Sequence, residues 1–598
     1  MKRSLLIEKI VIFLSFTVLT LALTYPGILR ISTHFMCDTG DGFSGVWNLW
    51  WLKTALLELH TNPFYTTYFY YPNGVNLLLH NFTLFYGLIS IPLQYLFKME
   101  VVYNLLVLSS FIIAGFGMYL LSFYLTDSRP AAFIAGIIYT FCPYHFGHGL
   151  GQLHMISLEW IPFYVLYLFK TFQQGGPRNA FLTGFFLILI TFCSWYYLFY
   201  SFFFMILFLT YQLIFNRSKV LNRIYIQDLF LSLLTFLTVF LPLLIPIMYS
   251  YLTEQFYGVH YPTYWSADLL SFFIPGAIST YGEYFQNIWS TFSGNTAENS
   301  NYIGYIVLSL AIYALIKAKE VKFWAASGLI FFILALGPYL RIMGVNTKIP
   351  LPYLLLDRYV PLFSFTGIAE RIAILIIFCL AILTAMAIKT LSNKIKNSGI
   401  KNLIIVVISI LIILEYLAVP YTTTKVEVPE FYWRIAKEPD DYAIIDIPHP
   451  FSLTVLYFQT IHRKKMVLGY VSRTPKKSLE FLRSIPIISD FFFLDQKEHN
   501  YPESVKLAQS IFDSNNIRYV ILRRFDRKEL LEIKDDLPLK YKKMIHRFIR
   551  IEDFLESELK LPVIYDDGGT YMSGDPSRNE YYINGGIKVY DCRGKANH

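Results

Sequence analysis

IVIFLSFTVLTLALTYPGIL, residues 10–29, is the first of the apolar runs that decide how this chain folds. A helix needs about 20 apolar residues to cross the hydrocarbon core of a bilayer, and this run has that length. Lys2, Arg3 and Lys9 precede it, and no small-residue cleavage site follows it. We therefore expect an uncleaved signal anchor whose N-terminus lies in the cytoplasm.

Further apolar runs continue as far as Pro420. The 598 residues are 55% hydrophobic and 16% charged, whereas ordinary soluble domains carry roughly 25% charged residues. Residues 1–420 are therefore predicted to form a polytopic α-helical membrane domain with about 11 spans. The spans expected after the first are 101–126, 131–145, 154–171, 179–195, 196–215, 227–249, 302–317, 323–341, 371–390 and 402–420.

The basic residues support one orientation of these spans. Residues 1–420 contain 23 Lys and Arg residues, and 16 of them fall in loops that this arrangement places in the cytoplasm. That distribution is the one expected for a multi-pass protein of the cytoplasmic membrane. Three long loops then lie on the outer side, at residues 30–100, 250–301 and 342–370.

Two points of this arrangement stay open. Residues 82–97 are apolar enough to cross the membrane, and a crossing there would invert every later loop. We expect them instead to lie in the outer leaflet or to dip into it. The division of residues 179–215 into two helices is also uncertain, because no charged residue separates the halves.

After Pro420 the chain becomes a mixture of charged residues and short apolar runs. Runs of β-branched residues bounded by Gly, Pro or Asp are typical of strands, and helical patterns alternate with them. Residues 421–598 are therefore predicted to form a soluble extracytoplasmic α/β domain. We expect strands at 442–448, 465–471, 517–524, 562–567 and 585–591, and helices at 476–490, 501–515 and 526–536.

Several function classes find no support in the sequence. The net charge of +9 does not indicate nucleic-acid binding, because most of the excess lies in the membrane part, where basic loops set orientation. No Walker loop and no dinucleotide fingerprint is present. Only Cys37 and Cys592 could form a disulfide, and no CxxC or Cys/His metal spacing occurs.

The first outer loop holds the strongest candidates for chemistry: HFMCDTGDGFSGVWNLWWLKTALLELHTNPFYTTYFYYPNGVNLLLH, residues 34–80. It opens with Asp38 and Asp41, and glycines on both sides of Asp41 let the backbone approach a ligand closely. Residues 44–58 are expected to form a helix with an apolar face at the membrane interface. The alternative is a solvated loop with an aromatic belt, since D-x-x-D is a weak pattern.

A second group of polar residues lies in YHFGHGLGQLHMISLEW, residues 144–160. Ionisable groups at membrane depth are functional candidates by default, and these could bind phosphate or ligate a divalent ion. The alternative is a hydrogen-bonded network that holds helices together. The residues concerned are His145, His148, His154 and Glu159, with Glu298 as a further candidate before the span at 302.

A first span followed by an outer loop that opens with acids resembles the GT-C superfamily of integral membrane glycosyltransferases. Other segments are similar to those of prokaryotic multi-spanning proteins of this kind: SRPAAFIAGIIYTFCPYHFGH (128–148), EWIPFYVLYL (159–168), ALGPYLRIMG (335–344) and YFQTIHRKKMVLGYVSRTP (457–475). The resemblance implies that a loop acid is the catalytic base or a metal ligand, and that the donor is a sugar on a polyprenyl phosphate. Where relatives show an Arg-x-Pro-x-Arg-like stretch, GIAERIAI keeps only Glu370 and Arg371.

The leading hypothesis is therefore a glycosyltransferase at the outer face of the membrane. A carboxylate can take the proton of an attacking hydroxyl, which makes Asp41, or Asp38, the candidate base. Arg371, His148 and His154 are the candidates for binding the donor phosphate, whose charge grows as it leaves. For Arg371 the alternative is an interfacial side chain that reaches to water. Second-line site residues are His145, Glu159 and Glu298.

The expected partners are a polyprenyl-phosphate-linked sugar, the lipid bilayer, and a glycan, lipid or protein acceptor, but no nucleic acid. A divalent cation, Mg²⁺ or Mn²⁺, is a candidate cofactor with unknown ligands. The basic segment 457–473 could bind an anionic acceptor or lipid headgroups, or be a solvated face.

Two other classes stay open: a non-catalytic transporter or assembly factor for envelope polysaccharide or lipid, and a structural scaffold. Transporters often carry acids near the bilayer midplane. Here the acids cluster in outer loops, which favours chemistry at the surface.

Overall fold

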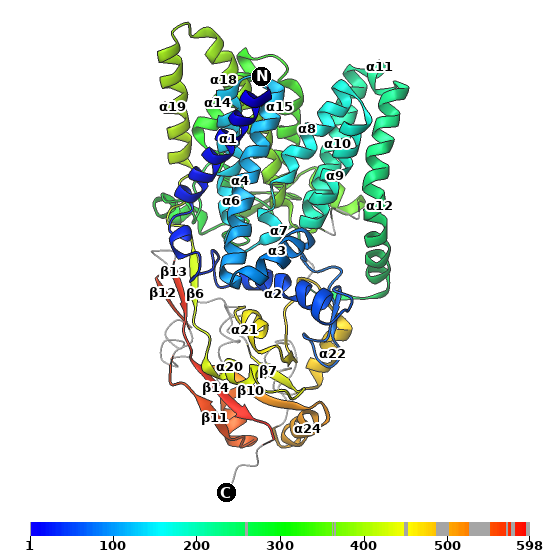
Figure 1. Ribbon diagram of the computed structural model, residues 1–598, viewed down its shortest axis with the longest axis vertical. Helices are drawn as coiled ribbons and strands as arrows, with labels where there is room; N and C mark the ends of the chain where they lie inside the picture. The colour runs from blue at the N-terminus through cyan, green and yellow to red at the C-terminus, as the bar shows by residue number, and fades with distance from the viewer. Residues whose placement is uncertain are drawn as a thin grey trace.

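The computed structural model describes residues 2–257, 261–360, 363, 366–447, 453–485, 489, 501–524, 551–569, 572–575 and 580–593. A bundle of apolar helices occupies one end of the molecule and an α/β domain the other (Figure 1). This arrangement confirms the predicted fold class of a multi-pass helical membrane protein with a C-terminal α/β domain.

Six helical segments among the described residues are long and apolar enough to cross a membrane. They lie in α1 (Lys2–Leu23), α4 (Met99–Thr126), α10 (Trp195–Phe215), α12 (Arg223–Thr253), α18 (Ala373–Lys394) with the turn before it, and α19 (Ser398–Glu415). Shorter helices coincide with the other expected spans: α5 (Arg129–Thr140), α8 (Trp160–Gln174), α9 (Pro177–Cys193), α14 (Tyr305–Lys317) and α15 (Lys322–Ala335). The total of about 11 crossings stays a prediction.

The two ends of α1 contact different parts of the protein, as the distribution of basic residues predicts. Arg129, at the start of α5, donates a hydrogen bond of 2.6 Å to Glu8 near the N-terminus. Arg30, beyond the other end of α1, forms an ion pair of 2.7 Å with Glu580 of the α/β domain. The N-terminus and the domain after Pro420 therefore lie at opposite ends of the bundle (Figure 1).

Residues 82–97 do not carry the chain across the bundle. They contain α3 (Leu84–Leu96), whose 13 residues span about 20 Å at 1.5 Å per residue, less than a bilayer core of about 30 Å. Phe35 pairs with Thr424 of the α/β domain before α3, and Glu100 accepts a hydrogen bond from Tyr457 of that domain after it. The chain therefore enters and leaves α3 on the same side.

The α/β domain is built on a five-stranded mixed sheet of order β11-β14-β10-β7-β8. In it β10 is parallel to β7 and antiparallel to β14. The helices α20 (Glu430–Ala436), α21 (Val455–His462), α22 (Lys476–Ser484) and α24 (Tyr501–Ser514) belong to this domain. The strands are β7 (Ala443–Asp446), β8 (Lys465–Met466), β10 (Ile517–Arg523), β11 (Val563–Asp566) and β14 (Ile587–Asp591).

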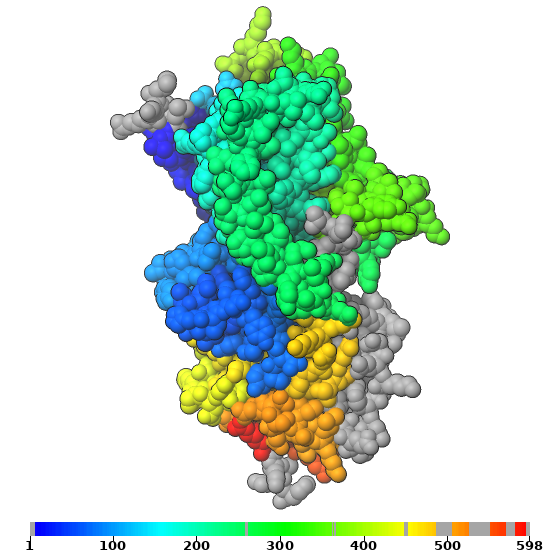
Figure 2. Space-filling view, turned by 90° about the vertical axis from the view of Figure 1, so that its right-hand side faces the viewer, coloured from blue at the N-terminus to red at the C-terminus, as the bar shows by residue number. Residues whose placement is uncertain are grey.

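All five expected strands contribute to this sheet, but one prediction is wrong in its length. The strand expected at 465–471 ends at Met466, because the chain then leaves the sheet and runs to the helical bundle. Its next strand, β9 (Thr474–Pro475), pairs with β3 (Phe256–Tyr257), which follows α12. Figure 2 shows α12 extending along the bundle to this point. The expected helix 526–536 and the end of the one at 476–490 lie outside the described residues.

A second sheet, of order β12-β13-β6, joins the domain to the bundle. It consists of β6 (Thr423–Val426), β12 (Met572–Asp575) and β13 (Glu580–Ile583), none of which the sequence pattern indicated. The strand β6 comes directly after the last span, so the sheet begins where the chain leaves the bundle.

The helix expected at the membrane interface is instead buried between the two domains. It is α2 (Asp41–Lys53), which continues into a π-helical turn at Thr54–Glu58. Trp47 is 1% exposed, stacks on Phe69 with ring centroids 4.1 Å apart, and donates a hydrogen bond of 2.7 Å to Gln459 in α21. The interfacial prediction is therefore wrong, because the tryptophans pack against protein and not against lipid. The Cys37–Cys592 disulfide is also absent, since both cysteines are free.

Candidate active site

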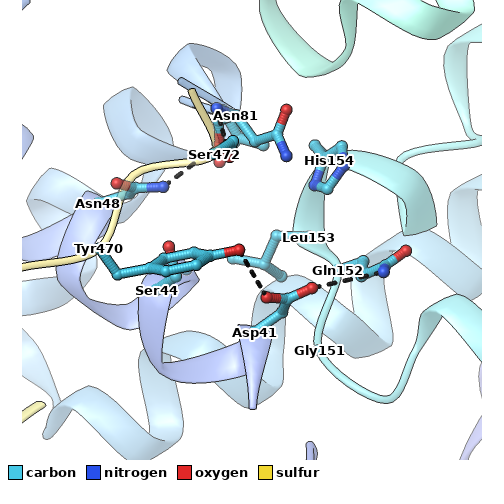
Figure 3. A pocket seen from close by; sticks show the side chains of 12 residues that line it. Asp41, Ser44, Asn48, Asn81, Gly151, Gln152, Leu153, His154, Tyr470 and Ser472 are labelled. Atoms are coloured by element: carbon cyan, nitrogen blue, oxygen red, sulfur yellow. Dashed lines mark hydrogen bonds between the residues drawn. The ribbon is translucent and has the colours of Figure 1, made fainter. Parts of the chain in front are cut away.

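The first turn of α2 carries Asp41 at the junction between bundle and domain. Asp41, Ser44 and Asn48 follow one another at helical spacing and share one face of α2. This face lines a small polar cavity of about 30 Å³ (Figure 3). The other lining residues are Gly45, Asn81, Thr83, Gly151, Gln152, Leu153, His154, Tyr470 and Ser472.

Each carboxylate oxygen of Asp41 accepts one hydrogen bond. The Gln152 amide nitrogen lies 3.4 Å from Oδ2, and the Tyr470 hydroxyl lies 3.4 Å from Oδ1 (Figure 3). Burial raises the pKa of Asp41 above its ordinary value, while the Gln152 hydrogen bond, the Arg371 charge and the Tyr470 hydrogen bond act against this rise. The carboxylate is therefore more basic than one in water, as a general base must be.

Gln152 connects Asp41 to His148. Its amide oxygen lies 2.6 Å from Nδ1 of His148, and its amide nitrogen faces Asp41. With the amide in this orientation, Nδ1 of His148 must carry the proton that it donates to Gln152. Burial lowers the pKa of His148 to about 4, so its ring is neutral near pH 7.

His148 leads in turn to a buried ion pair. Its Nε2 lies 3.9 Å from Oε2 of Glu298, a contact without a hydrogen bond, because the proton of the neutral ring is on Nδ1. Oε1 of Glu298 accepts two hydrogen bonds from Arg371, from Nε at 2.8 Å and from Nη2 at 2.5 Å. Four separate segments thus bring Asp41, His148, Glu298 and Arg371 into one buried cluster.

Arg371 does not reach to water. It is 5% exposed, and its guanidinium lies over the ring of Tyr196, 4.4 Å from the centroid. The interfacial alternative for this residue is therefore wrong. Glu298 occupies the Nε edge of the guanidinium, while Nη1 makes no hydrogen bond with a described residue. The Nη1 side of the Arg371 guanidinium therefore remains available to an anionic ligand.

Asp38 lies beside this buried cluster and not in it. Its Oδ1 accepts a hydrogen bond of 2.8 Å from the Gly40 backbone, and its own backbone N–H donates one of 2.8 Å to Leu150. Burial raises the pKa of Asp38 to about 7. Because it does not line the cavity, Asp38 is placed to hold the loop before α2.

The remaining acid and histidine candidates divide between the cavity and the packing of helices. His154 lines the cavity. His145 is instead stacked on Phe111, with ring centroids 3.8 Å apart, and bonded to Ser110 at 2.8 Å. Glu159 accepts a hydrogen bond of 2.9 Å from Tyr86. His145 and Glu159 therefore hold helices together, away from Asp41.

The basic segment 457–473 is neither a free basic face nor remote from the site. Arg463 is paired with Glu58 at 2.9 Å, and Lys465 with Asp441 at 2.8 Å. Its contribution to the cavity comes from uncharged residues, Tyr470 and Ser472. Ser472 is fixed by a hydrogen bond of 3.1 Å to His80.

The described ranges bring no three His, Cys, Asp or Glu side chains close enough together to hold a metal ion. The candidate divalent cation therefore has no complete ligand set in this part of the protein.

Gln152 and Tyr470 complete the site, and sequence reasoning missed both. A glutamine between two histidine candidates and a tyrosine in a basic segment carry no chemical signal by themselves. The helical spacing of Asp41, Ser44 and Asn48 was a usable signal, because it predicts one polar face on an otherwise apolar helix.

Sequence comparison does not identify a family: no protein-family model and no curated protein matches the chain. Among solved structures, the arabinofuranosyltransferase AftD from Mycobacteria aligns with 98% of this chain and 41% of its own, at a TM-score of 0.52 and 11% identity. At this identity the likeness shows a shared fold alone.

Two structures of the Archaeoglobus fulgidus oligosaccharyltransferase are also similar. One, tethered with an acceptor peptide, covers 94% of this chain and 73% of its own, with a TM-score of 0.47 and 11% identity. The other, in complex with an inhibitory peptide and a dolichol-phosphate, covers 90% and 70%, with a TM-score of 0.47 and 12% identity.

Proposed function

We propose that this protein is a membrane glycosyltransferase that moves a sugar from a polyprenyl-phosphate donor to an envelope acceptor, at the outer face of the cytoplasmic membrane. The observation that carries the proposal is the buried cluster of Asp41, Gln152, His148, Glu298 and Arg371, in which Gln152 bonds to both Asp41 and His148, and Glu298 bonds to Arg371. The cluster places a buried base near a buried cation, at one end of a bundle of apolar helices.

Asp41 is the base in this proposal. An acceptor hydroxyl attacks the anomeric carbon of the donor sugar, and its oxygen forms the new glycosidic bond. The bond from that carbon to the phosphate oxygen breaks, and its electron pair leaves with the lipid phosphate. The acceptor proton passes to the Asp41 carboxylate, whose raised pKa suits it to this task.

Arg371 stabilises the leaving phosphate. A guanidinium can bind phosphate oxygens through two N–H groups, and such bonds strengthen as charge develops on the leaving group. Glu298 positions Arg371 by holding its Nε edge, which leaves Nη1 directed away from the ion pair. The Arg371 charge also lowers the pKa of Asp41, so the two ends of the site influence each other.

His148 and Gln152 are positioning residues in this proposal. The neutral ring of His148 fixes the oxygen of the Gln152 amide at 2.6 Å, and this directs the amide nitrogen to Asp41. A histidine that is neutral near pH 7 cannot bind phosphate as a cation. We therefore assign the phosphate to Arg371, and His148 to the orientation of the base.

The alternative is a transporter or assembly factor that binds the same lipid without chemistry. A carboxylate held between two hydrogen-bond donors beside a polar cavity favours catalysis, because lipid binding alone has no need of a buried base. The two functions also differ in what they do to the donor: an enzyme consumes it and a transporter does not.

The test is transfer by the purified full-length protein in lipid nanodiscs. A panel of radiolabelled polyprenyl-phosphate sugars is offered with an envelope extract as the acceptor source. We expect at least one donor to be consumed, by the wild type and by Asp127→Asn, but not by Asp41→Asn. Asp127 is a matched control because it is an exposed acid at the far end of α4. Donor binding without consumption would favour the transporter.

A further inference from the structure

The cavity beside Asp41 is lined by groups that form hydrogen bonds but carry little charge. Asp41 is the only Asp, Glu, Lys or Arg among its 12 lining residues. Asn48 and Ser44 come from α2, and Ser472 comes from the α/β domain. Such a lining suits the hydroxyl groups of a sugar better than a phosphate or a carboxylate, which would need a cation.

Two buried polar atoms of this lining have no hydrogen-bond partner among the described residues. They are Oγ1 of Thr83 and Nε2 of His154. Thr83 is 3% exposed and His154 is 8% exposed. By contrast, His80 behind the lining is bonded on both ring nitrogens, to Ser472 and Asn48, each at 3.1 Å. A buried polar atom without a partner costs free energy, which a ligand hydroxyl in the cavity would recover.

The size of the cavity limits what can enter it. Its volume of about 30 Å³ is two to three times the roughly 10–15 Å³ that one water molecule needs. A hydroxyl group fits this space. An acetamido group, with its four non-hydrogen atoms, exceeds it, and a carboxylate would also bring a second negative charge next to Asp41.

We propose that this cavity binds one hydroxyl group of an unmodified neutral sugar, held by Thr83 and His154 next to Asp41. The inference rests on the proposed function and deepens it, because it excludes sugars with an acetamido or carboxylate group at that position. The same chemistry would hold a hydroxyl of the donor sugar or of an acceptor sugar, and the experiment separates the two.

The first measurement is binding of simple glycosides to the full-length protein in nanodiscs, by saturation-transfer difference NMR. The probes are the methyl glycosides of glucose, mannose, galactose and arabinofuranose, with those of N-acetylglucosamine and glucuronic acid for comparison. We expect at least one neutral glycoside to bind, and the last two to bind at least tenfold more weakly. Binding of either of these as tight as the best neutral glycoside would overturn the proposal.

Thr83→Val is the variant that tests the residues. Valine has nearly the shape of threonine and lacks the hydroxyl, so glycoside binding should weaken by roughly tenfold for one lost hydrogen bond. Thr384→Val is the matched control, because Thr384 in α18 is also buried with an unpartnered hydroxyl but does not line the cavity. Equal binding by the two variants would overturn the proposal.

Stability gives a second readout that does not depend on transfer. Removing a buried hydroxyl without a partner should leave the melting temperature unchanged or raise it. If Thr83→Val does not fold, His154→Phe, which removes the other polar atom without a partner, tests the same loss of binding. Unaltered binding in His154→Phe would then overturn the proposal.

Steady-state transfer then identifies the sugar. An increase in KM for the donor alone in Thr83→Val assigns the cavity to the donor sugar, and an increase for the acceptor alone assigns it to the acceptor sugar. If the protein transfers sugar but binds all the methyl glycosides equally well, this inference is wrong and the proposed function stands. If it binds neutral glycosides selectively but transfers no sugar, the cavity is as inferred and the proposed function is wrong.

Discussion

The hydroxyl of Tyr470 lies 3.4 Å from Oδ1 of Asp41, although 429 positions separate the two residues in the sequence. Asp41 begins α2, the first α-helix after α1, and Tyr470 belongs to the segment that leaves the five-stranded sheet after β8. The site is therefore assembled from both domains. The α/β domain contributes Tyr470 and Ser472 to the candidate site.

Tyr470→Phe should shift the acid limb of the pH profile to higher pH. The Tyr470 hydrogen bond stabilises the ionised form of Asp41 and so lowers its pKa. Without it the pKa rises, and at a given pH on the acid side fewer molecules carry the carboxylate that accepts the proton. We expect kcat/KM, measured against pH, to fall in the variant at pH values where the wild type is still active, with a smaller difference at alkaline pH.

Tyr442→Phe is the control for this shift. Its hydroxyl also donates to a carboxylate, that of Glu438, at 2.8 Å, but Tyr442 does not line the cavity. Its profile should match that of the wild type. Superimposable profiles for Tyr470→Phe and Tyr442→Phe would show that Asp41 does not set the acid limb.

Arg371→Ala should weaken both the donor complex and the fold. The loss of charge-assisted hydrogen bonds to phosphate corresponds to roughly 10–100-fold in donor affinity. Removing one partner of a buried ion pair also leaves Glu298 uncompensated, which typically costs about 3–5 kcal/mol. We expect donor binding, measured by titration in nanodiscs, and the melting temperature to fall together.

A double variant separates these two effects. Arg371→Gln combined with Glu298→Gln removes both charges, so stability should largely return while donor affinity stays low. Arg371→Lys should recover only part of the affinity, because an ammonium lacks the planar fork of the guanidinium. Wild-type donor affinity in the double variant would exclude Arg371 as the phosphate ligand.

The bundle was predictable from sequence because hydrophobic length alone decides where a chain crosses a membrane. Every expected span contains a helix, and α9 and α10 separate between Cys193 and Trp195 without a charged residue. The site was predictable in its acids, in His148 and His154 and in Arg371, because ionisable side chains stand out in apolar surroundings. Gln152 and Tyr470 are uncharged and belong to no motif, and they reach Asp41 only in the folded chain. The same holds for the tryptophans of α2, because an apolar face fits a lipid interface and a domain interface equally well.

The topology predicts that loop 216–223 and residue 480 lie on opposite sides of the membrane. Single cysteines at Ser218→Cys and Glu480→Cys are suitable, because both positions are exposed. The background carries Cys592→Ser, since the other four cysteines are buried. An impermeant maleimide applied to whole cells should label position 480 only, and both positions after permeabilisation. Labelling of position 218 in intact cells would reverse the orientation.

Asp41→Asn should reduce sugar transfer by roughly 10²–10⁴-fold, the usual contribution of a general base. The amide keeps the shape of the side chain and can still bond to Tyr470 and Gln152, so folding should be preserved, and donor binding should change little because Arg371 holds the phosphate. Asp38→Asn should cost less, since Asp38 bonds to the Gly40 backbone and does not line the cavity. Transfer rates and donor affinities of both variants, measured beside Asp127→Asn, decide the roles: a larger loss in Asp38→Asn would exchange them, and full activity in both would place the catalytic base elsewhere.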